Sequence, residues 1–412
     1  SLVAAELAAA FPEEGGIYHW VRAAFGDNIG MLAVWLQWIN TVVWYPTILS
    51  FIAGTLTYLF NPSLMENKAY MICVIAGIFW ALTIMNLFGL KISALLNTIF
   101  SGIGTVFPML FLILLGSIWV IAGHPLQIPI TPSSILPALD QFDTWTALEA
   151  VMAGFIGMEL SGVHVNNVPH PQTTFPKALL LSSIYILATM LLGSLTIAVV
   201  LPESKINLAG GLMQVFDSFF HAFHLGSFVP LMSVLIVVGS VGGMINWLIS
   251  PAKGLLHASQ HGFLPTFFTQ ANRHGVAGRI LITQAVLVTL FCAILLLLPS
   301  VNGFYWFLTA LSNCLYMAMY VLMFLAVYRL RSKKLDRAFK IPGGKWGIAI
   351  TSSLGLIGSI LTIIFGFVPP SNVNIGSGLR YTLMIAIGNF LLICPIFFLI
   401  ARKQRRSKAK HS

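Results

Sequence analysis

One carboxylate lies inside an apolar stretch of the chain and is surrounded by glycines. Glu159 belongs to Ala-Gly154-Phe-Ile-Gly157-Met-Glu159-Leu-Ser-Gly162, and the three glycines weaken any helix around it. A broken helix at membrane depth offers backbone N–H and C=O groups to a ligand, such as an amino-acid carboxylate. We therefore predict a substrate site built on Gly154, Gly157 and Glu159, with Glu159 also handling a proton. The alternative is structural, with Glu159 bonding neighbouring helices and the glycines serving close packing.

Aromatic residues form the second candidate feature. In Asn-Cys-Leu-Tyr316-Met-Ala-Met-Tyr320, the i, i+4 spacing puts both tyrosines on one helix face, suited to lining a polar cavity. Trp247 follows the stretch Gly-Gly-Met-Ile-Asn, so a flexible segment, a side-chain amide and an aromatic ring occur together there. We include all three residues in the predicted substrate site. Aromatic residues are also common inside spans and at membrane interfaces, so packing and anchoring are their alternative roles.

Other kinds of chemistry lack their sequence signatures. The chain contains no Walker A, Gly-x-Ser-x-Gly, His-Glu-x-x-His or kinase motif, and no potassium-channel filter sequence. Cys73, Cys292, Cys314 and Cys394 fall in apolar runs without metal-ligand spacing, so we expect small buried hydrophobes. We expect no enzyme activity, no metal, no cofactor and no use of ATP by this chain.

The composition indicates a protein that spans a membrane many times. Of 412 residues, 58% are hydrophobic and 8% are charged, whereas soluble domains carry about a quarter charged residues. The net charge of +10 comes from Lys and Arg between and after apolar runs, which is typical of cytoplasmic loops. A nucleic-acid partner is therefore disfavoured, and the expected fold class is an all-α polytopic membrane protein.

Ten segments have the roughly 20 apolar residues that a span requires. They are 31–59, 69–87, 98–122, 145–165, 178–201, 228–249, 280–299, 303–328, 346–368 and 381–400. Residues 1–11 are apolar but too short to span, and we interpret them as the end of a helix whose start is missing. Glu149 falls near the predicted outer end of the span 145–165, where we expect it to be hydrated.

The positive residues predict the orientation. A cytoplasmic basic tail at 401–412 places every Lys and Arg inside except Lys68, Lys205 and Arg380. No loop is long enough for a soluble domain, so residues 1–412 are predicted to form a single transmembrane transporter domain.

The chain resembles the amino acid-polyamine-organocation (APC) transporter superfamily and, within it, the glutamate/gamma-aminobutyrate antiporter family of bacterial acid-resistance exchangers. The segments that carry the resemblance run through nearly the whole chain. They are Ala5-Glu6-Leu, Pro12-Glu-Glu-Gly-Gly-Ile-Tyr18-His-Trp20-Val, Phe155-Ile-Gly-Met-Glu159, His164-Val-Asn166, Ile206-Asn-Leu-Ala-Gly-Gly-Leu-Met-Gln214, Trp247-Leu-Ile-Ser-Pro251-Ala-Lys253-Gly254, Tyr316 with Tyr320, Ile341-Pro-Gly-Gly-Lys345 and Pro369-Pro370.

The resemblance implies twelve helices, with helices 1–5 and 6–10 as inverted repeats and helices 1 and 6 broken around a central site. On that template residues 1–11 end helix 2, residues 31–328 hold helices 3 to 10, residues 346–400 hold helices 11 and 12, and helix 1 is missing. Glu159 then matches the acidic residue of helix 6, Tyr316 and Tyr320 the paired tyrosines of helix 10, and Trp247 an aromatic bordering the pocket.

The predicted function is a secondary amino acid antiporter of the bacterial cytoplasmic (inner) membrane, with a cytoplasmic C-terminus. It exchanges glutamate, or a similar amino acid, for the decarboxylation product by alternating access, in the service of acid resistance. Its expected partners are amino acid substrates, the lipid bilayer and, as an open option, a second copy of the chain. Two alternatives stand beside it: a proton- or sodium-coupled amino-acid symporter, and a non-transporting remnant or partner-binding membrane protein.

Overall fold

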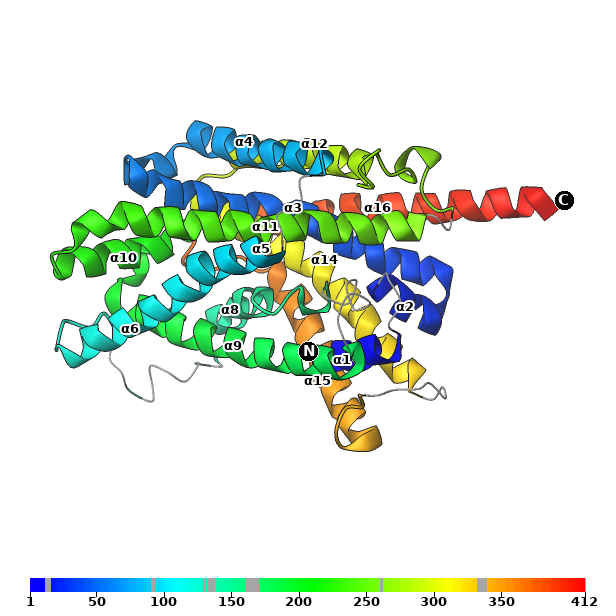
Figure 1. Ribbon diagram of the computed structural model, residues 1–412, viewed down its shortest axis with the longest axis horizontal. Helices are drawn as coiled ribbons and strands as arrows, with labels where there is room; N and C mark the ends of the chain where they lie inside the picture. Colours follow the sequence, from blue (N-terminus) through cyan, green and yellow to red (C-terminus); the bar gives the residue numbers. More distant parts are fainter. Residues whose placement is uncertain are drawn as a thin grey trace.

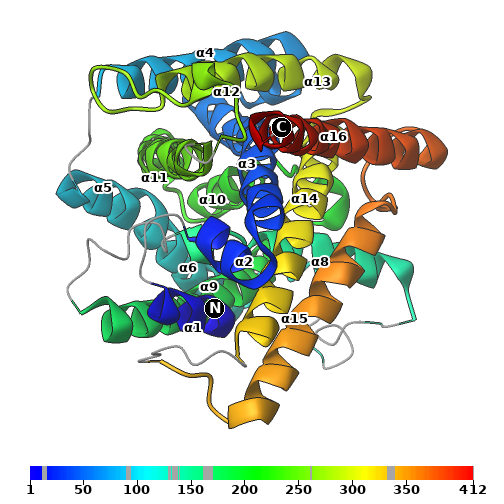
Figure 2. The same cartoon turned by 90° about the vertical axis from the view of Figure 1, so that its right-hand side faces the viewer.

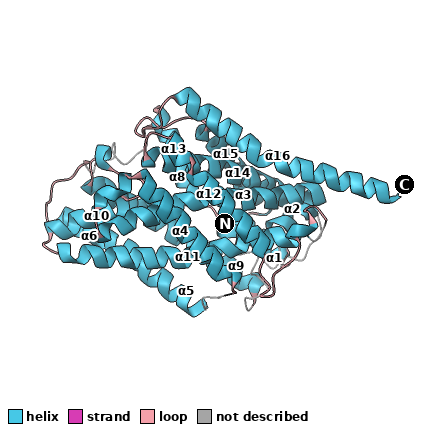
Figure 3. Ribbon diagram, turned by 90° about the horizontal axis from the view of Figure 1, so that it is seen from above, coloured by secondary structure: helices cyan, strands magenta, loops and turns pink. Residues whose placement is uncertain are grey.

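The computed structural model describes residues 1–11, 16–89, 94–128, 131, 138, 140–160, 170–259, 262–331 and 339–411. Over these ranges the regular structure is helical, and no strand occurs in them (Figure 3). This confirms the all-α fold class. The α-helices are α1 (Leu2–Ala10), α2 (Ile17–Phe25), α3 (Asp27–Leu56), α4 (Lys68–Leu87), α5 (Ala94–Ser101), α6 (Phe107–Ile121), α8 (Phe142–Ala153), α9 (Pro171–Val200), α10 (Gly211–Ala222), α11 (Val229–Ser259), α12 (Gly278–Cys292), α13 (Ile294–Leu297), α14 (Val301–Leu330), α15 (Gly344–Gly366) and α16 (Gly378–His411).

Nine helical segments within the described residues are long and apolar enough to cross a membrane, and they correspond to nine of the ten expected spans. They are Asp27–Leu59, Lys68–Leu87, Thr98–Ile121, Thr173–Val200, Gly226–His257, Gly278–Leu297, Val301–Leu330, Gly344–Gly366 and Gly378–Arg405. The expected span 145–165 is not among them, and its residues 161–165 lie outside the described part of the chain. Its helix, α8, ends at Ala153, because the glycine-rich segment that follows forms turns.

Two helices form the middle of the bundle. In their most apolar windows 72% of α14 and 67% of α3 is buried, against 11% of α16. Figure 2 shows α3 and α14 at the centre, with α4 and α12 along one side and α15 and α16 at the edge. The residues of α3 and α14 therefore have mostly protein neighbours, and polar groups on them need partners inside the bundle.

The outer helices expose large apolar side chains. Leu181 on α9, Leu354 on α15 and Phe390 on α16 are all exposed, which is stable in hydrocarbon and costly in water. Cys73 and Cys394 also lie on such outward faces, so the expectation of burial is correct for Cys292 and Cys314 and wrong for these two. The exposed apolar surface agrees with a bundle surrounded by lipid.

Residues 1–11 form α1, which packs along α9 (Figure 1). Its Glu6 is 1% exposed, and its carboxylate accepts hydrogen bonds from the Arg331 guanidinium and, at 2.8 Å, from the Ile341 backbone N–H. A buried charge is stable only with such partners. Glu6 therefore joins α1 to the end of α14 and to the backbone just before α15.

Two glycines allow a close crossing of helices. Residues Gly102–Val106 form a π-helical turn between α5 and α6, and Gly104 faces Gly239 of α11. A Cβ on Gly239 would lie 2.4 Å from the Gly104 backbone, and one on Gly104 would lie 2.2 Å from the Leu235 carbonyl oxygen. Small residues at such contacts let two backbones approach in a membrane.

We predict that Gly239→Ala destabilises the protein, because the new methyl group meets backbone atoms that no side-chain rotation can move. Overpacking of this kind costs about 1–3 kcal/mol. Gly243→Ala is the matched control on the same helix, since nothing lies within 4 Å of its added Cβ. Thermal unfolding of the detergent-purified variants checks the prediction: equal unfolding temperatures for both would contradict it.

Candidate functional site

The predicted site segment follows α8 as irregular backbone. After Ala153 the chain forms turns through Gly157, which has φ of +93°, and then a short 3-10 turn at residues 158–160. Phe155 and Ile156 donate backbone hydrogen bonds to Met152 and Ala153, three residues earlier. Helix α8 therefore ends at the glycines, and residues 154–160 continue as turns. Gly162 lies outside the described residues.

The interruption brings Glu159 into a buried set of hydrogen-bond donors. Glu159 is 2% exposed. Tyr316 donates a hydrogen bond to Oε1, Tyr320 donates to Oε2 at 2.7 Å, and Gln37 of α3 donates to Oε1 from Nε2 at 3.2 Å. Three donors around two oxygens suit an ionised carboxylate, which only accepts hydrogen bonds. The expected i, i+4 tyrosine pair thus meets the expected carboxylate.

Tyr320 also contacts the irregular backbone. Its hydroxyl oxygen accepts a hydrogen bond from the Gly157 N–H at 3.3 Å and has the Phe155 carbonyl oxygen within 3.4 Å. The rings of Tyr316 and Tyr320 meet edge to face, 5.1 Å apart. One hydroxyl therefore serves both the carboxylate and a backbone group that lies outside regular helical bonding.

Trp247 of α11 lies directly over Gly157. A Cβ on Gly157 would come within 2.2 Å of the indole ring, so only glycine fits both this contact and the positive φ. The Trp247 ring packs on Trp44 at 5.1 Å, and its backbone carbonyl accepts a hydrogen bond from Tyr45 at 2.9 Å. The structure therefore places Trp247 beside the segment, while Gly154 instead faces the Met190 side chain on α9.

The sequence reasoning missed the contribution of α3. Gln37 bonds Glu159, and one turn later Asn40 donates to the backbone and hydroxyl oxygens of Ser312 at 2.7 and 2.8 Å. Both amides lie in an apolar run, where a polar group needs a partner. The rarity of polar residues in that run is the signal that could have identified them.

Glu149 is a second buried carboxyl group, and the expectation that it is hydrated is wrong. It is 1% exposed, because α14 and α15 cover the face of α8 that carries it. Asn313 donates to its Oε2 at 2.6 Å and to its backbone oxygen at 2.8 Å. Its Oε1 has no hydrogen-bond partner among the described residues and lies against Gly366 of α15.

The arrangement can bind a cationic or proton-bearing group, and the described ranges contain no cluster of His, Cys, Asp and Glu able to hold a metal ion. The carboxylate and the two phenols form a hydrogen-bonded unit at the break of a helix, and α3 closes one side. Protonation would make Glu159 a donor as well as an acceptor, so one of its three donors would have to turn away.

Comparisons with known proteins agree with these features. The family model described as amino acid permease matches residues 1–390. An uncharacterized transporter of Legionella pneumophila is 40% identical over 98% of this chain and 87% of its own length. A glutamate/gamma-aminobutyrate antiporter of Lactococcus lactis is 29% identical over 97% of this chain and 81% of its own. A probable agmatine/putrescine antiporter of the same species is 24% identical over 98% and 85%.

These matches do not support the expectation that a first helix and the start of a second are missing before Ser1. The assignment of the spans to helices 3 to 12 of a twelve-helix template stays a prediction.

We predict that Gly157→Ala disrupts the site, because alanine disfavours the positive φ and its methyl group collides with the Trp247 ring. Gly154→Ala, three residues earlier, is the control: its φ is −67° and its new methyl group meets the flexible end of Met190. Thermal unfolding of both variants and their binding of labelled glutamate check this. Gly157→Ala should lower the unfolding temperature more and weaken binding, and equal behaviour would contradict the geometry.

Proposed function

The chain belongs to the amino acid permease family, and on this basis we propose that it is a secondary transporter that exchanges one amino acid for a related amino acid or amine. The proposed mechanism is alternating access without ATP. The proposed exchange is of the glutamate/gamma-aminobutyrate type. The observation that carries the proposal is Glu159, a buried carboxylate on interrupted backbone with Tyr316 and Tyr320 as its donors.

Interrupted backbone suits the recognition of a zwitterion. A zwitterionic substrate needs donors for its carboxylate and acceptors for its ammonium, and the backbone around Gly157 has both kinds of group outside regular helical bonding. Glu159 supplies a negative charge for the ammonium. In this proposal, Gly154 and Gly157 shape the backbone of the site, Tyr316 and Tyr320 line it, and Trp247 borders it.

The protonation of Glu159 is the proposed link to pH. When Glu159 binds a proton, Tyr320 can turn its hydroxyl toward the Phe155 carbonyl oxygen, which lies within 3.4 Å. The charge of the site and the hydrogen bonding of the broken segment then change together. The charge state of the accepted substrate follows from the charge of the site.

Relatives support exchange over other kinds of transport. Two of those reported above are named as antiporters, one for glutamate and gamma-aminobutyrate and one, probably, for agmatine and putrescine. For this chain we propose glutamate, or a similar polar amino acid, against its decarboxylation product, which removes one proton equivalent per cycle and serves acid resistance.

Counterflow in proteoliposomes tests the mode of transport. In proteoliposomes that contain the purified chain, uptake of labelled glutamate should rise about tenfold or more when unlabelled glutamate or gamma-aminobutyrate is preloaded inside. The reason is that the site of an antiporter turns back to the outer side only with an internal substrate bound. Empty liposomes and liposomes preloaded with an unrelated sugar are the controls. Uptake that ignores the preloaded compound and follows a proton or sodium gradient would instead establish a symporter.

Substitution of Glu159 tests its role in the pH dependence of transport. Glu159→Gln keeps the size of the side chain but cannot titrate, so exchange should become nearly independent of pH and slow by at least tenfold at the pH of highest wild-type activity. Glu149→Gln is the matched control, because Glu149 is equally buried on the same stretch of chain. A Glu159→Gln protein with the wild-type pH profile, or a flat profile in Glu149→Gln alone, would remove Glu159 from this role.

A further inference from the structure

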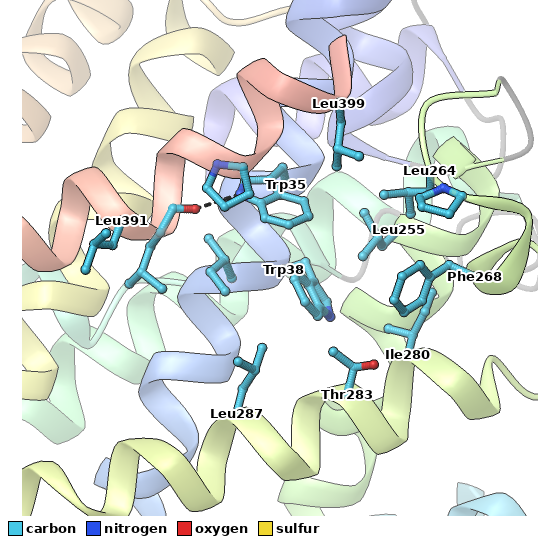
Figure 4. A pocket seen from close by; sticks show the side chains of 14 residues that line it. Trp35, Trp38, Leu255, Leu264, Phe268, Ile280, Thr283, Leu287, Leu391 and Leu399 are labelled. Atoms are coloured by element: carbon cyan, nitrogen blue, oxygen red, sulfur yellow. Dashed lines mark hydrogen bonds between the residues drawn. The ribbon is translucent and has the colours of Figure 1, made fainter. Parts of the chain in front are cut away.

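An apolar groove runs between α3, α11, α12 and α16, away from Glu159. It has a volume of about 330 Å³, and Trp35, Trp38, Leu255, Thr283, Leu287 and Leu391 are among its lining residues (Figure 4). Thr283 contributes the only side-chain hydroxyl to this lining. The groove therefore offers dispersion contacts and almost no hydrogen bonds, which excludes amino acids and other polar solutes as its ligand.

The groove is closed on the side of α3 and open beside α16. Trp38 and Ile280 are buried, whereas Leu391 is 61% exposed and Pro395 is exposed. Leu391 and Leu399 both line the groove, so it follows α16 for eight residues, a rise of about 12 Å. An elongated apolar slot that opens toward the surrounding hydrocarbon has the form of an acyl-chain site.

Positive charge collects at one end of the groove. Lys403 lies 3.5 Å from the centre of the Phe263 ring, next to the lining residue Leu264. The Arg279 guanidinium lies 4.4 Å from the Phe267 ring centre. The residues that follow these two in the chain, Ile280 and Phe268, line the groove. The two cations thus flank the same end, where α16 leaves the apolar part of the bundle.

Little negative charge balances this end. Lys403 and Arg22 share one carboxylate, Asp27, at 3.6 and 2.6 Å. Arg279 has no carboxylate partner within the ranges that the structure describes, and its guanidinium donates a hydrogen bond to the Phe267 carbonyl oxygen at 2.8 Å. The sequence contains no Asp or Glu from 253 to 279 or from 401 to 412. An anionic group is therefore the favoured neighbour of this end.

We propose that the groove binds an anionic phospholipid, with one acyl chain in the slot and the headgroup phosphate between Arg279 and Lys403. The apolar lining selects the chain, and the unbalanced cations select the anionic headgroup over a neutral zwitterionic one. Basic residues between membrane helices recognise anionic headgroups in this way. The bound lipid would contact Trp35 and Trp38, which flank Gln37 on α3.

The experiment is native mass spectrometry of the full chain in detergent, titrated with phosphatidylglycerol or with phosphatidylcholine of the same acyl chains. We expect one tightly retained phosphatidylglycerol and a dissociation constant at least fivefold higher for phosphatidylcholine. Arg279→Gln should weaken phosphatidylglycerol binding about fivefold, the usual effect of one basic residue near a membrane surface. Lys345→Gln, which removes an exposed charge at the start of α15, is the matched control and should change nothing.

A second variant tests the acyl chain. Thr283→Trp fills the slot and should abolish the retained lipid at an unchanged thermal unfolding temperature, and Leu391→Trp on the open side serves the same purpose if Thr283→Trp does not fold. Equal retention of both lipids, an equal effect of Lys345→Gln, or a lipid count unchanged by filling the slot would overturn the proposal. So would a nanodisc structure in which a second copy of the chain occupies the groove.

Discussion

A carboxylate on broken helical backbone inside a membrane must find its hydrogen-bond donors within the protein, and the centre of this structure is arranged around that requirement. The Tyr320 hydroxyl donates to Glu159 and also accepts a hydrogen bond from the backbone N–H of Gly157. Tyr316 and Gln37 supply the other donors. The two most buried spans, α14 and α3, therefore each contribute polar groups to one short segment, which explains why these helices lie in the middle.

The main parts of the site could be predicted from the sequence because they violate a general rule. A Glu between glycines in an apolar run is costly unless it is paired, and two tyrosines four residues apart share a helix face. The structure brings Glu159, Tyr316, Tyr320 and Trp247 together, while their role in binding substrate stays a prediction. The end of α8 at Ala153 follows from the same glycines. Residues 145–165 were nevertheless expected to form a span, because apolar composition shows that a segment is long enough to cross the membrane but not that its helix is continuous.

Long-range partners could not be read from the sequence. The pairing of Gln37 with Glu159 joins residues 122 positions apart, and that of Glu6 with Arg331 joins residues 325 apart. No periodicity connects such positions. Glu149 shows the same limit: its place near a predicted interface indicated water, but α14 and α15 enclose it and Asn313 takes the place of solvent. Burial of this kind depends on how whole helices pack.

Asn313, Tyr316 and Tyr320 lie at i, i+3 and i+7 on α14, so one face of a single rigid helix holds both buried carboxyl groups, Glu149 and Glu159. Hydrogen bonds weaken steeply when donor and acceptor separate by about 1 Å. A slide of α14 along its axis therefore strains the three contacts together rather than one after another. Any movement of α14 relative to the two carboxyl groups would break these bonds as a group, so the activation barrier to that movement would rise with every bond in the row.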